Sequence, residues 1–313
     1  MESFIYSVNA TVPIFLVMIV GGILRKLNII DEHFANVANK FVFVVTLPLM
    51  VFSDLAAADF RAEFDPKFVI YCMAVTLLSI CTIWALTEIF MKEEDSKGSF
   101  VQGAYRSSAA ILGMAFIKNM YQDTGMAPLM IIAAVPLYNI FAVIILTVKA
   151  KGNKGRVNFG KTFINILKNP IIIGIFAGVL FSVLGIRMPN ILTKTVNMIG
   201  DMTTPLALIC IGATFEGRKA IKKLVPTCIA TALKLVILPA LFLPVAILLG
   251  FRNQEMMAIV IMLGSPTTIS SYIMAKNMNN DAVLSSSIIV LTTLLSSLTL
   301  TGIIFILRLG GYV

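Results

Sequence analysis

The sequence has few charged residues and a single histidine. Only 13% of its 313 residues are charged and 58% are hydrophobic, whereas soluble domains have about 25% charged and about 45–50% apolar residues. His33 lies in a polar loop beside Asp31 and Glu32, which argues against a histidine-based active site. A soluble domain of this composition would expose large apolar patches and aggregate, so a water-soluble fold is excluded.

Motifs of common catalytic and nucleotide sites are also absent. The sequence contains no P-loop, GxSxG, HExxH or paired-carboxylate motif, so we expect neither direct use of ATP nor an enzyme. The four cysteines lie inside apolar runs, without the spacing of a disulfide or a metal site: Cys72, Cys81, Cys210 and Cys228. No metal and no cofactor is therefore expected.

What the sequence has instead is a series of long apolar runs. A helix of about 20 apolar residues crosses the hydrocarbon core of a membrane, and a helix satisfies its backbone hydrogen bonds internally, as lipid requires. The predicted fold is an all-α polytopic membrane protein. Its ten expected spans are 4–24, 35–56, 67–91, 99–120, 126–148, 168–186, 194–215, 221–249, 254–276 and 282–307.

Basic residues follow the loops between these runs. The net charge of +9 could suggest nucleic acid, but topology explains it better, and no nucleic-acid partner is expected. When alternate loops are assigned to opposite sides, 16 of the 25 Lys and Arg fall on one side, which the positive-inside rule makes cytoplasmic. Both termini are then extracytoplasmic, in a multi-pass protein of the cell (plasma or inner) membrane.

The two halves of the chain resemble each other. The pattern K-N-M-x-x-D begins at Lys118 and again at Lys276, and a displacement of 157 residues superposes Pro13 on Pro170 and Pro48 on Pro205. The sequence predicts a five-helix repeat (1–148), a basic cytoplasmic linker (149–167) and a second five-helix repeat (168–313). Since five is odd, the second repeat is inverted, as in many transporters.

The fourth and ninth spans are the least hydrophobic and correspond in the repeat. Pro266 lacks a backbone N–H and should break the ninth helix, and the freed N–H groups and half-helix dipoles favour an anion. The alternative is a packing seam of small residues. The candidate substrate-binding residues in these spans are Arg106, Ser107, Ser108, Gly113, Ser265, Pro266, Thr267, Thr268 and Ser270.

Three further polar residues, Lys234, Asn139 and Asp201, lie inside apolar runs. Arg106 and Lys234 are the basic residues far from span ends, and either could bind an anion or extend its charge to the interface. Asn139 in the fifth span is also a candidate ligand. Asp201 is the acid we expect to carry a coupling proton or pair with a cation, with a helix N-cap as the alternative.

These landmarks resemble the auxin efflux carrier family, which includes bacterial malate and malonate permeases and the plant PIN carriers. The resemblance extends over nearly the whole chain. The segments that carry it include Val12-Pro13 to Leu27-Asn28, Leu47-Pro48-Leu49, Lys118 to Tyr121, Leu137-Tyr138-Asn139, Pro205 to Gly212, Lys234-Leu235 with Pro239, and Pro266 to Lys276 with Asp281.

The resemblance implies ten helices in the fold of bile-acid symporters and some sodium/proton antiporters, with broken helices 4 and 9 crossing at the substrate site. It also implies elevator-like alternating access and a homodimer. Two positions depart from the family: Ser108 replaces a frequent Asn, and Ala115 a usual Pro. The predicted function is secondary transport of small organic anions such as dicarboxylates. The alternative is a sodium- or proton-coupled symporter or antiporter for another solute or cation.

Overall fold

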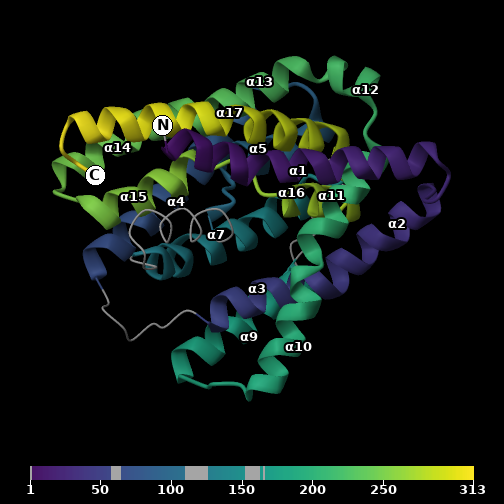
Figure 1. Cartoon of the computed structure of the whole chain (residues 1–313), viewed down its shortest axis with the longest axis horizontal. Helices are drawn as coiled ribbons and strands as arrows, with labels where there is room; N and C mark the ends of the chain where they lie inside the picture. Colours follow the sequence, from purple (N-terminus) through teal and green to yellow (C-terminus); the bar gives the residue numbers. More distant parts are fainter. Residues whose placement is uncertain (1, 58–64, 110–125, 152–162, 165) are drawn as a thin grey trace.

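The computed structural model describes residues 2–57, 65–109, 126–151, 163–164 and 166–313. Over these residues the protein is helical, with no strand (Figure 1). The helices of the first half are α1 (Glu2–Lys26), α2 (Glu32–Phe41), the π-helical segment η1 (Val42–Thr46), α3 (Leu47–Ala56), α4 (Pro66–Phe90), α5 (Glu94–Tyr105) and α7 (Ala127–Val148).

The second half follows a similar order of long and divided helices. It contains α9 (Pro170–Leu184), α10 (Asn190–Asp201), α11 (Thr203–Thr214), α12 (Gly217–Lys222), α13 (Leu224–Ala232), the π-helical segment η3 (Leu233–Ile237), α14 (Leu238–Leu248), α15 (Asn253–Gly264), α16 (Ser270–Asn277) and α17 (Ala282–Leu309). Most of the predicted linker lies outside the described residues.

Six helices in the described part of the chain are long and apolar enough to cross a membrane. Their continuous spans are Glu32–Ala56, Pro66–Phe90, Ala127–Val148, Asn190–Thr214, Leu224–Leu248 and Ala282–Leu309. The fourth and ninth predicted spans are not continuous helices here, because α5, α15 and α16 are only 12, 12 and 8 residues long. The described part of the chain is thus helical throughout its regular structure and contains several helices that can span a membrane.

Each π-helical segment is followed by a leucine and a proline. Pro48 follows η1 and Pro239 follows η3. Proline cannot donate to the carbonyl of the preceding turn and clashes with it, and a widened π turn relieves that conflict within a continuous helix. η1 carries Thr46 and η3 carries Lys234, so both widened turns hold buried polar side chains.

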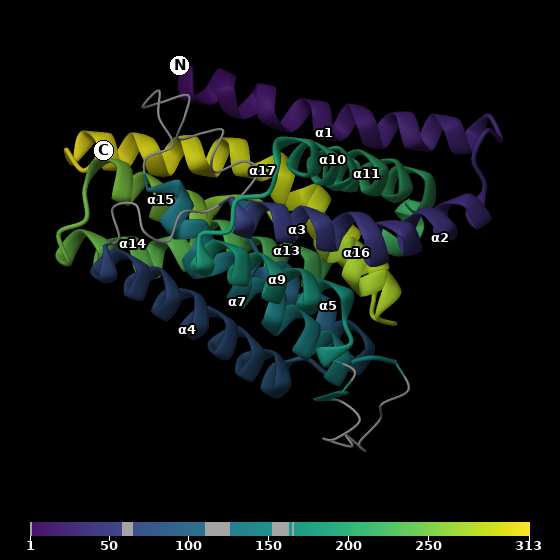
Figure 2. The ribbon, with the colours of Figure 1, turned by 90° about the horizontal axis from the view of Figure 1, so that it is seen from below.

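The apolar side chains form two separate cores. One core joins α4, α5, α7, α13, α14, α15 and α17. The other joins α1, α2, η1, α3, α9, α11 and α16 with the C-terminal part of α7. In Figure 2, α1 lies along one edge of the molecule and α4 along the opposite edge, with the remaining labelled helices between them.

Helices of the second core pack by close backbone contact at glycines. A Cβ on Gly21 of α1 would clash with the carbonyl of Ile209 in α11, and one on Gly178 of α9 would clash with the carbonyl of Phe52 in α3. The two contacts are equivalent in the repeat, because at a displacement of 157 Gly21 corresponds to Gly178 and Phe52 to Ile209. At the same displacement, Thr203 corresponds to Thr46, and their hydroxyls are hydrogen-bonded to each other at 2.8 Å.

Candidate functional site

Two helices, α5 and α15, end where the cores meet. α15 ends at Gly264 and α16 begins at Ser270, so the discontinuity that Pro266 predicts is present. α5 ends at Tyr105, and Arg106, its C-cap, has extended backbone angles (φ −70°, ψ 134°). Gly113, the other predicted point of irregularity, lies outside the described residues.

The two interruptions cross in direct contact. The backbone N–H of Ser108 donates to the carbonyl of Pro266 at 2.9 Å. The Ser107 hydroxyl donates to the carbonyl of Met262, in the last turn of α15. In return, the Thr267 hydroxyl donates to the carbonyl of Gly103, in the last turn of α5, at 2.7 Å. Each interruption thus satisfies a carbonyl at the end of the other half-helix, which terminal carbonyls need in a dry interior.

A cavity of about 40 Å³ lies beside this crossing. That volume holds water or part of a small ligand, since one water needs at least about 10–15 Å³ by this measure. Its wall combines the extended segment after α5, the middle of α7, the start of α16 and one face of α3. The lining residues are Met50, Val51, Asp54, Arg106, Ser107, Ser108, Val135, Tyr138, Asn139, Thr268 and Ser270.

Arg106 is the cation in this wall, and only some of its side-chain N–H groups have hydrogen-bond partners. Arg106 is 3% exposed. Its Nη2 donates to Asn139 Oδ1 at 2.5 Å, and its Nη1 lies 2.8 Å from the sulfur of Met274. Its Nε has no hydrogen-bond partner among the described residues, and no carboxylate in this part of the chain forms an ion pair with it. The guanidinium therefore retains donor capacity and an uncompensated charge.

Asn139 is oriented for its contact with Arg106. Its amide nitrogen donates to the carbonyl of Val135 one turn earlier on α7, at 3.0 Å. That bond leaves the amide oxygen directed at the guanidinium, an acceptor suited to a planar donor. A neutral partner of this kind holds Arg106 in place without cancelling its charge.

Lys234, the other buried cation, occupies a different place. It is fully buried in η3, and its ammonium donates to the carbonyls of Met262, at 3.5 Å, and Leu263. These are carbonyls of the last turn of α15, where the helix dipole is negative. Lys234 does not line the cavity beside Arg106.

The predicted site residues other than Gly113 lie in four different places. Six of them line the cavity: Arg106, Ser107, Ser108, Asn139, Thr268 and Ser270. Ser265, Pro266 and Thr267 form the interruption itself and are buried behind this wall, and Lys234 lies at the end of α15. Asp201, the predicted coupling acid, is exposed at the end of α10 and outside the lining.

Asp54 was not among the predicted site residues, although it lines the cavity from α3. The sequence could have indicated Asp54, because it is an acid within the second predicted span, and acids inside spans are rare and usually functional. Its position near the end of a span masked that signal. Tyr138 also lines the cavity, next to Asn139 on α7.

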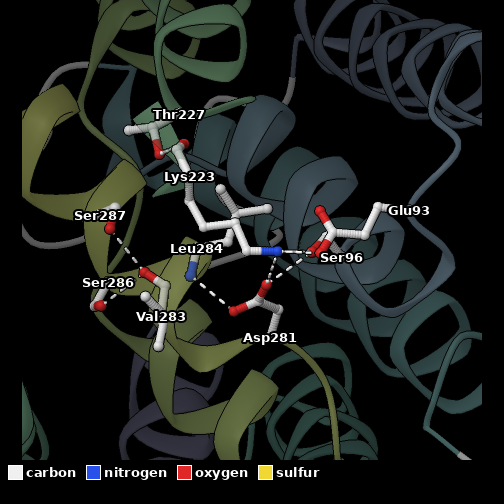
Figure 3. A network of polar contacts seen from close by, with 9 residues as sticks. All are labelled: Glu93, Ser96, Lys223, Thr227, Asp281, Val283, Leu284, Ser286 and Ser287. Atoms are coloured by element: carbon white, nitrogen blue, oxygen red, sulfur yellow. Dashed lines mark hydrogen bonds and ion pairs between the residues drawn. The ribbon is translucent and has the colours of Figure 1, made fainter. Parts of the chain in front are cut away.

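An ion-pair network holds the beginning of α5 (Figure 3). The ammonium of Lys223 binds Ser96 Oγ at 2.9 Å, Asp281 Oδ2 at 3.0 Å and the carboxylate of Glu93. Asp281 also caps α17, accepting from the N–H of Leu284 at 3.0 Å. The network joins the start of α5 to the starts of α13 and α17, and so positions the half-helix that ends at Arg106.

Burial by itself would raise the pKa of the Asp281 carboxyl. The hydrogen bonds from the Leu284 N–H and the Ser96 hydroxyl, and the ammonium of Lys223, outweigh burial and hold that pKa below its ordinary value. Asp281 is therefore ionised in the folded protein, and its charge is matched by Lys223. This contrasts with Arg106, whose charge has no such match.

Comparison with known proteins places the chain among membrane carriers. Residues 6–304 match the profile of the family described as "Membrane transport protein". The chain belongs to this family, the auxin efflux carrier family that its sequence resembles.

Three relatives show the extent of the similarity. An "Uncharacterized transporter" of Methanothermobacter thermautotrophicus is 23% identical, over 95% of this chain and 97% of its own. The transporter YfdV of Escherichia coli (strain K12) is 21% identical, over 88% and 89%. The "Putative malonate transporter" of Rhizobium meliloti (strain 1021) is 23% identical, over 87% of each chain. The chain is thus similar over nearly its whole length to proteins named as transporters.

Proposed function

We propose that this protein is a secondary carrier of small organic anions, with dicarboxylates as the preferred class. The observation that supports it most is Arg106, a buried guanidinium with a free Nε and no ion-paired carboxylate among the described residues, in the wall of a cavity. An Arg at the centre of a membrane helix costs about 2.5–3.5 kcal/mol on insertion scales. An anionic ligand offsets that cost by supplying the missing charge and acceptors.

The remainder of the cavity suits a carboxylate. Ser108, Thr268 and Ser270 line it and have hydroxyls that can donate, whereas the Ser107 hydroxyl already donates to Met262. Carboxylates accept hydrogen bonds from hydroxyls and from a guanidinium. A relative named as a malonate transporter supports a dicarboxylate in particular. Malonate is accordingly the first ligand to test.

We propose ten membrane crossings in two inverted five-helix repeats, 1–148 and 168–313. The first repeat comprises α1, α2 with η1 and α3, α4, the interrupted helix that begins with α5, and α7. The second comprises α9, α10 with α11, α13 with η3 and α14, α15 with α16, and α17. The matched contacts at a displacement of 157 support this duplication, and the Thr46–Thr203 bond lies where a two-fold axis would relate the repeats.

The arrangement of the two cores supports a proposal for alternating access. The cavity is lined by α3 of one core and by α7 and the segment after α5 from the other. We propose an elevator-like motion in which the unit of α4, α5, α7 and α13 to α17 slides along a stationary unit of α1 to α3 and α9 to α11. α16, whose side chains pack in the second core, then lies at the boundary between the two units. In this family the stationary units would pair as a homodimer.

Uptake into proteoliposomes tests the function. Vesicles containing the protein should accumulate labelled malonate or a related carboxylate unchanged, and vesicles containing Arg106→Gln should accumulate much less at the same low substrate concentration. Running the panel with and without sodium and pH gradients separates an anion carrier from a sodium- or proton-coupled carrier of another solute. Uptake of cations alone would contradict the proposal, and so would chemical conversion of the anion.

Sidedness is tested by labelling. In a cysteine-free background, a cysteine replacing exposed Lys219 on the basic side should react with impermeant reagents only from the cytoplasm. A cysteine replacing exposed Arg187 should react only from outside, as the proposed topology of extracytoplasmic termini requires. Reversed labelling would invert the topology without affecting the anion proposal.

A further inference from the structure

We propose that Asp54 is a proton-binding residue that controls the affinity of the neighbouring cavity for its anion. This inference rests on the proposed function. Ionised Asp54 opposes anion binding in the cavity that it shares with Arg106, and protonated Asp54 permits it, so the protein takes up a proton as the anion binds.

The shared cavity is the first observation. Asp54 reaches it from α3, whereas Arg106 reaches it from the segment after α5. Asp54 forms no ion pair with Arg106 or with any other cation of the described chain. A bound anion would therefore place a second negative charge in a wall that already contains an unpaired carboxylate. Two nearby carboxylates disfavour the state in which both are ionised.

The charged surroundings of Asp54 are sparse. Arg106 and Tyr138 line the same cavity, and α10, which ends at Asp201, packs against α3. Helix α9, which packs along α3, has no ionisable residue, and neither has η1. Lys194 on α10 and Arg187 before it are exposed. Asp54 is thus the carboxylate in the cavity wall, and its protonation would remove a negative charge beside the bound anion.

Proton binding and anion binding involve helices of different cores. α3 belongs to the second core, whereas α5, which ends just before Arg106, belongs to the first. The two charges face one cavity only in a conformation that brings the cores together as here. Proton uptake at Asp54 would then make loading on one side of the membrane depend on the pH of that side, without requiring the proton to travel with the anion.

Two measurements on the purified wild-type protein test the inference. Malonate affinity should fall about tenfold between about pH 6.5 and 8.5, where free carboxylates are already ionised. Calorimetry in buffers of different ionisation enthalpy should show close to one proton taken up per anion bound. Affinity that is independent of pH, with no proton uptake, would overturn the role of Asp54.

Variants then assign the proton to its residue. Asp54→Asn should bind malonate tightly over the whole range, with no proton uptake. Asp201→Asn should move the pH dependence to lower pH, because a neighbouring repulsion is removed. Asp95→Asn, an exposed carboxylate elsewhere on the chain, is the matched control and should behave as wild type. Persistence of proton uptake in a folded Asp54→Asn variant would assign the proton elsewhere.

The outcomes separate this inference from the proposed function. If malonate and the other carboxylates fail to bind at any pH, the anion carrier itself is contradicted. If they bind without proton uptake, only the role of Asp54 fails.

Discussion

Arg106 and Lys234 are both cations buried within predicted spans, and they are satisfied in opposite ways. The ammonium of Lys234 donates to carbonyls in the last turn of α15, so the negative end of a helix dipole faces its charge. The guanidinium of Arg106 has an amide, a thioether sulfur and an unpartnered Nε. The difference indicates that Lys234 completes the folded structure, whereas Arg106 is available to a ligand.

The first way to test this comparison is to remove the charge of Arg106. Arg106→Gln should weaken malonate binding by about tenfold to a hundredfold, the loss of one charge-assisted contact. Arg106→Lys should lose less, because it keeps the charge but not the planar fork. Titration of both purified variants measures the effect, and wild-type affinity in Arg106→Gln would show that the helix ends hold the anion alone.

The second test removes the charge of Lys234. Lys234→Met should lower the free energy of unfolding by about 1–2 kcal/mol, because the buried carbonyl of Leu263 loses its donor, whereas that of Met262 keeps the Ser107 hydroxyl. Malonate affinity in the folded protein should change by less than about threefold, since the residue lies outside the cavity. Thermal unfolding and titration of the same preparation provide both numbers. A large loss of affinity at unchanged stability would reverse the roles of the two cations.

The third test concerns the crossing on which both cations depend. Thr267→Val removes one hydroxyl and keeps the shape, and should cost about 1 kcal/mol of stability, since the carbonyl of Gly103 loses its donor. Affinity should fall about threefold, because α5 positions Arg106. Thr299→Val, on the partly buried part of α17 away from the crossing, is the control. Equal effects in both variants would show that the reciprocal bond has no special role.

The smallest effect is expected from removing the charge of Asp281, which forms an ion pair with Lys223. Lys223 contrasts with both buried cations, because carboxylates match its charge. Because the pKa of Asp281 is lowered in the folded protein, its ionised form stabilises the fold at pH above the ordinary value of about 4. That stabilisation is lost as pH falls through the folded value. At pH 7, Asp281→Asn should lose about 1 kcal/mol, and its difference from wild type should shrink toward zero in acid. Denaturant unfolding at several pH values measures it, and a difference that grows in acid would contradict the assignment.

Much of the organisation was predictable from local sequence. In lipid, an apolar run of 18 or more residues satisfies its backbone hydrogen bonds by forming a helix. The ends of long helices such as α4 and α17 therefore lie within two residues of the predicted ends. Pro266 predicted the interruption between α15 and α16, because a missing N–H is a local property. The ends of α5 were less predictable, since nothing in its sequence marks Tyr105 as its last residue.

The site was only partly predictable, for a physical reason. Arg106 and Lys234 cannot be distinguished from the sequence, because both are basic residues far from the ends of predicted spans. The groups that face each charge come from distant residues. The carbonyl of Leu263, 29 positions away, faces Lys234, and the sulfur of Met274, 168 positions away, faces Arg106. Asp54 was missed and Asp201 preferred for the same reason, since exposure at the end of α10 is not visible in the sequence.

The sequence by itself determined that this chain is a helical membrane protein of the carrier type, because the cost of exposing backbone and apolar surface is set residue by residue. Only the tertiary structure decided which polar side chains share a cavity. Bringing the segment after α5 against α3, α7 and α16 leaves one buried cation paired with a helix end and the other facing an open site. Electrostatic pairing depends on distance in space and not on distance along the chain.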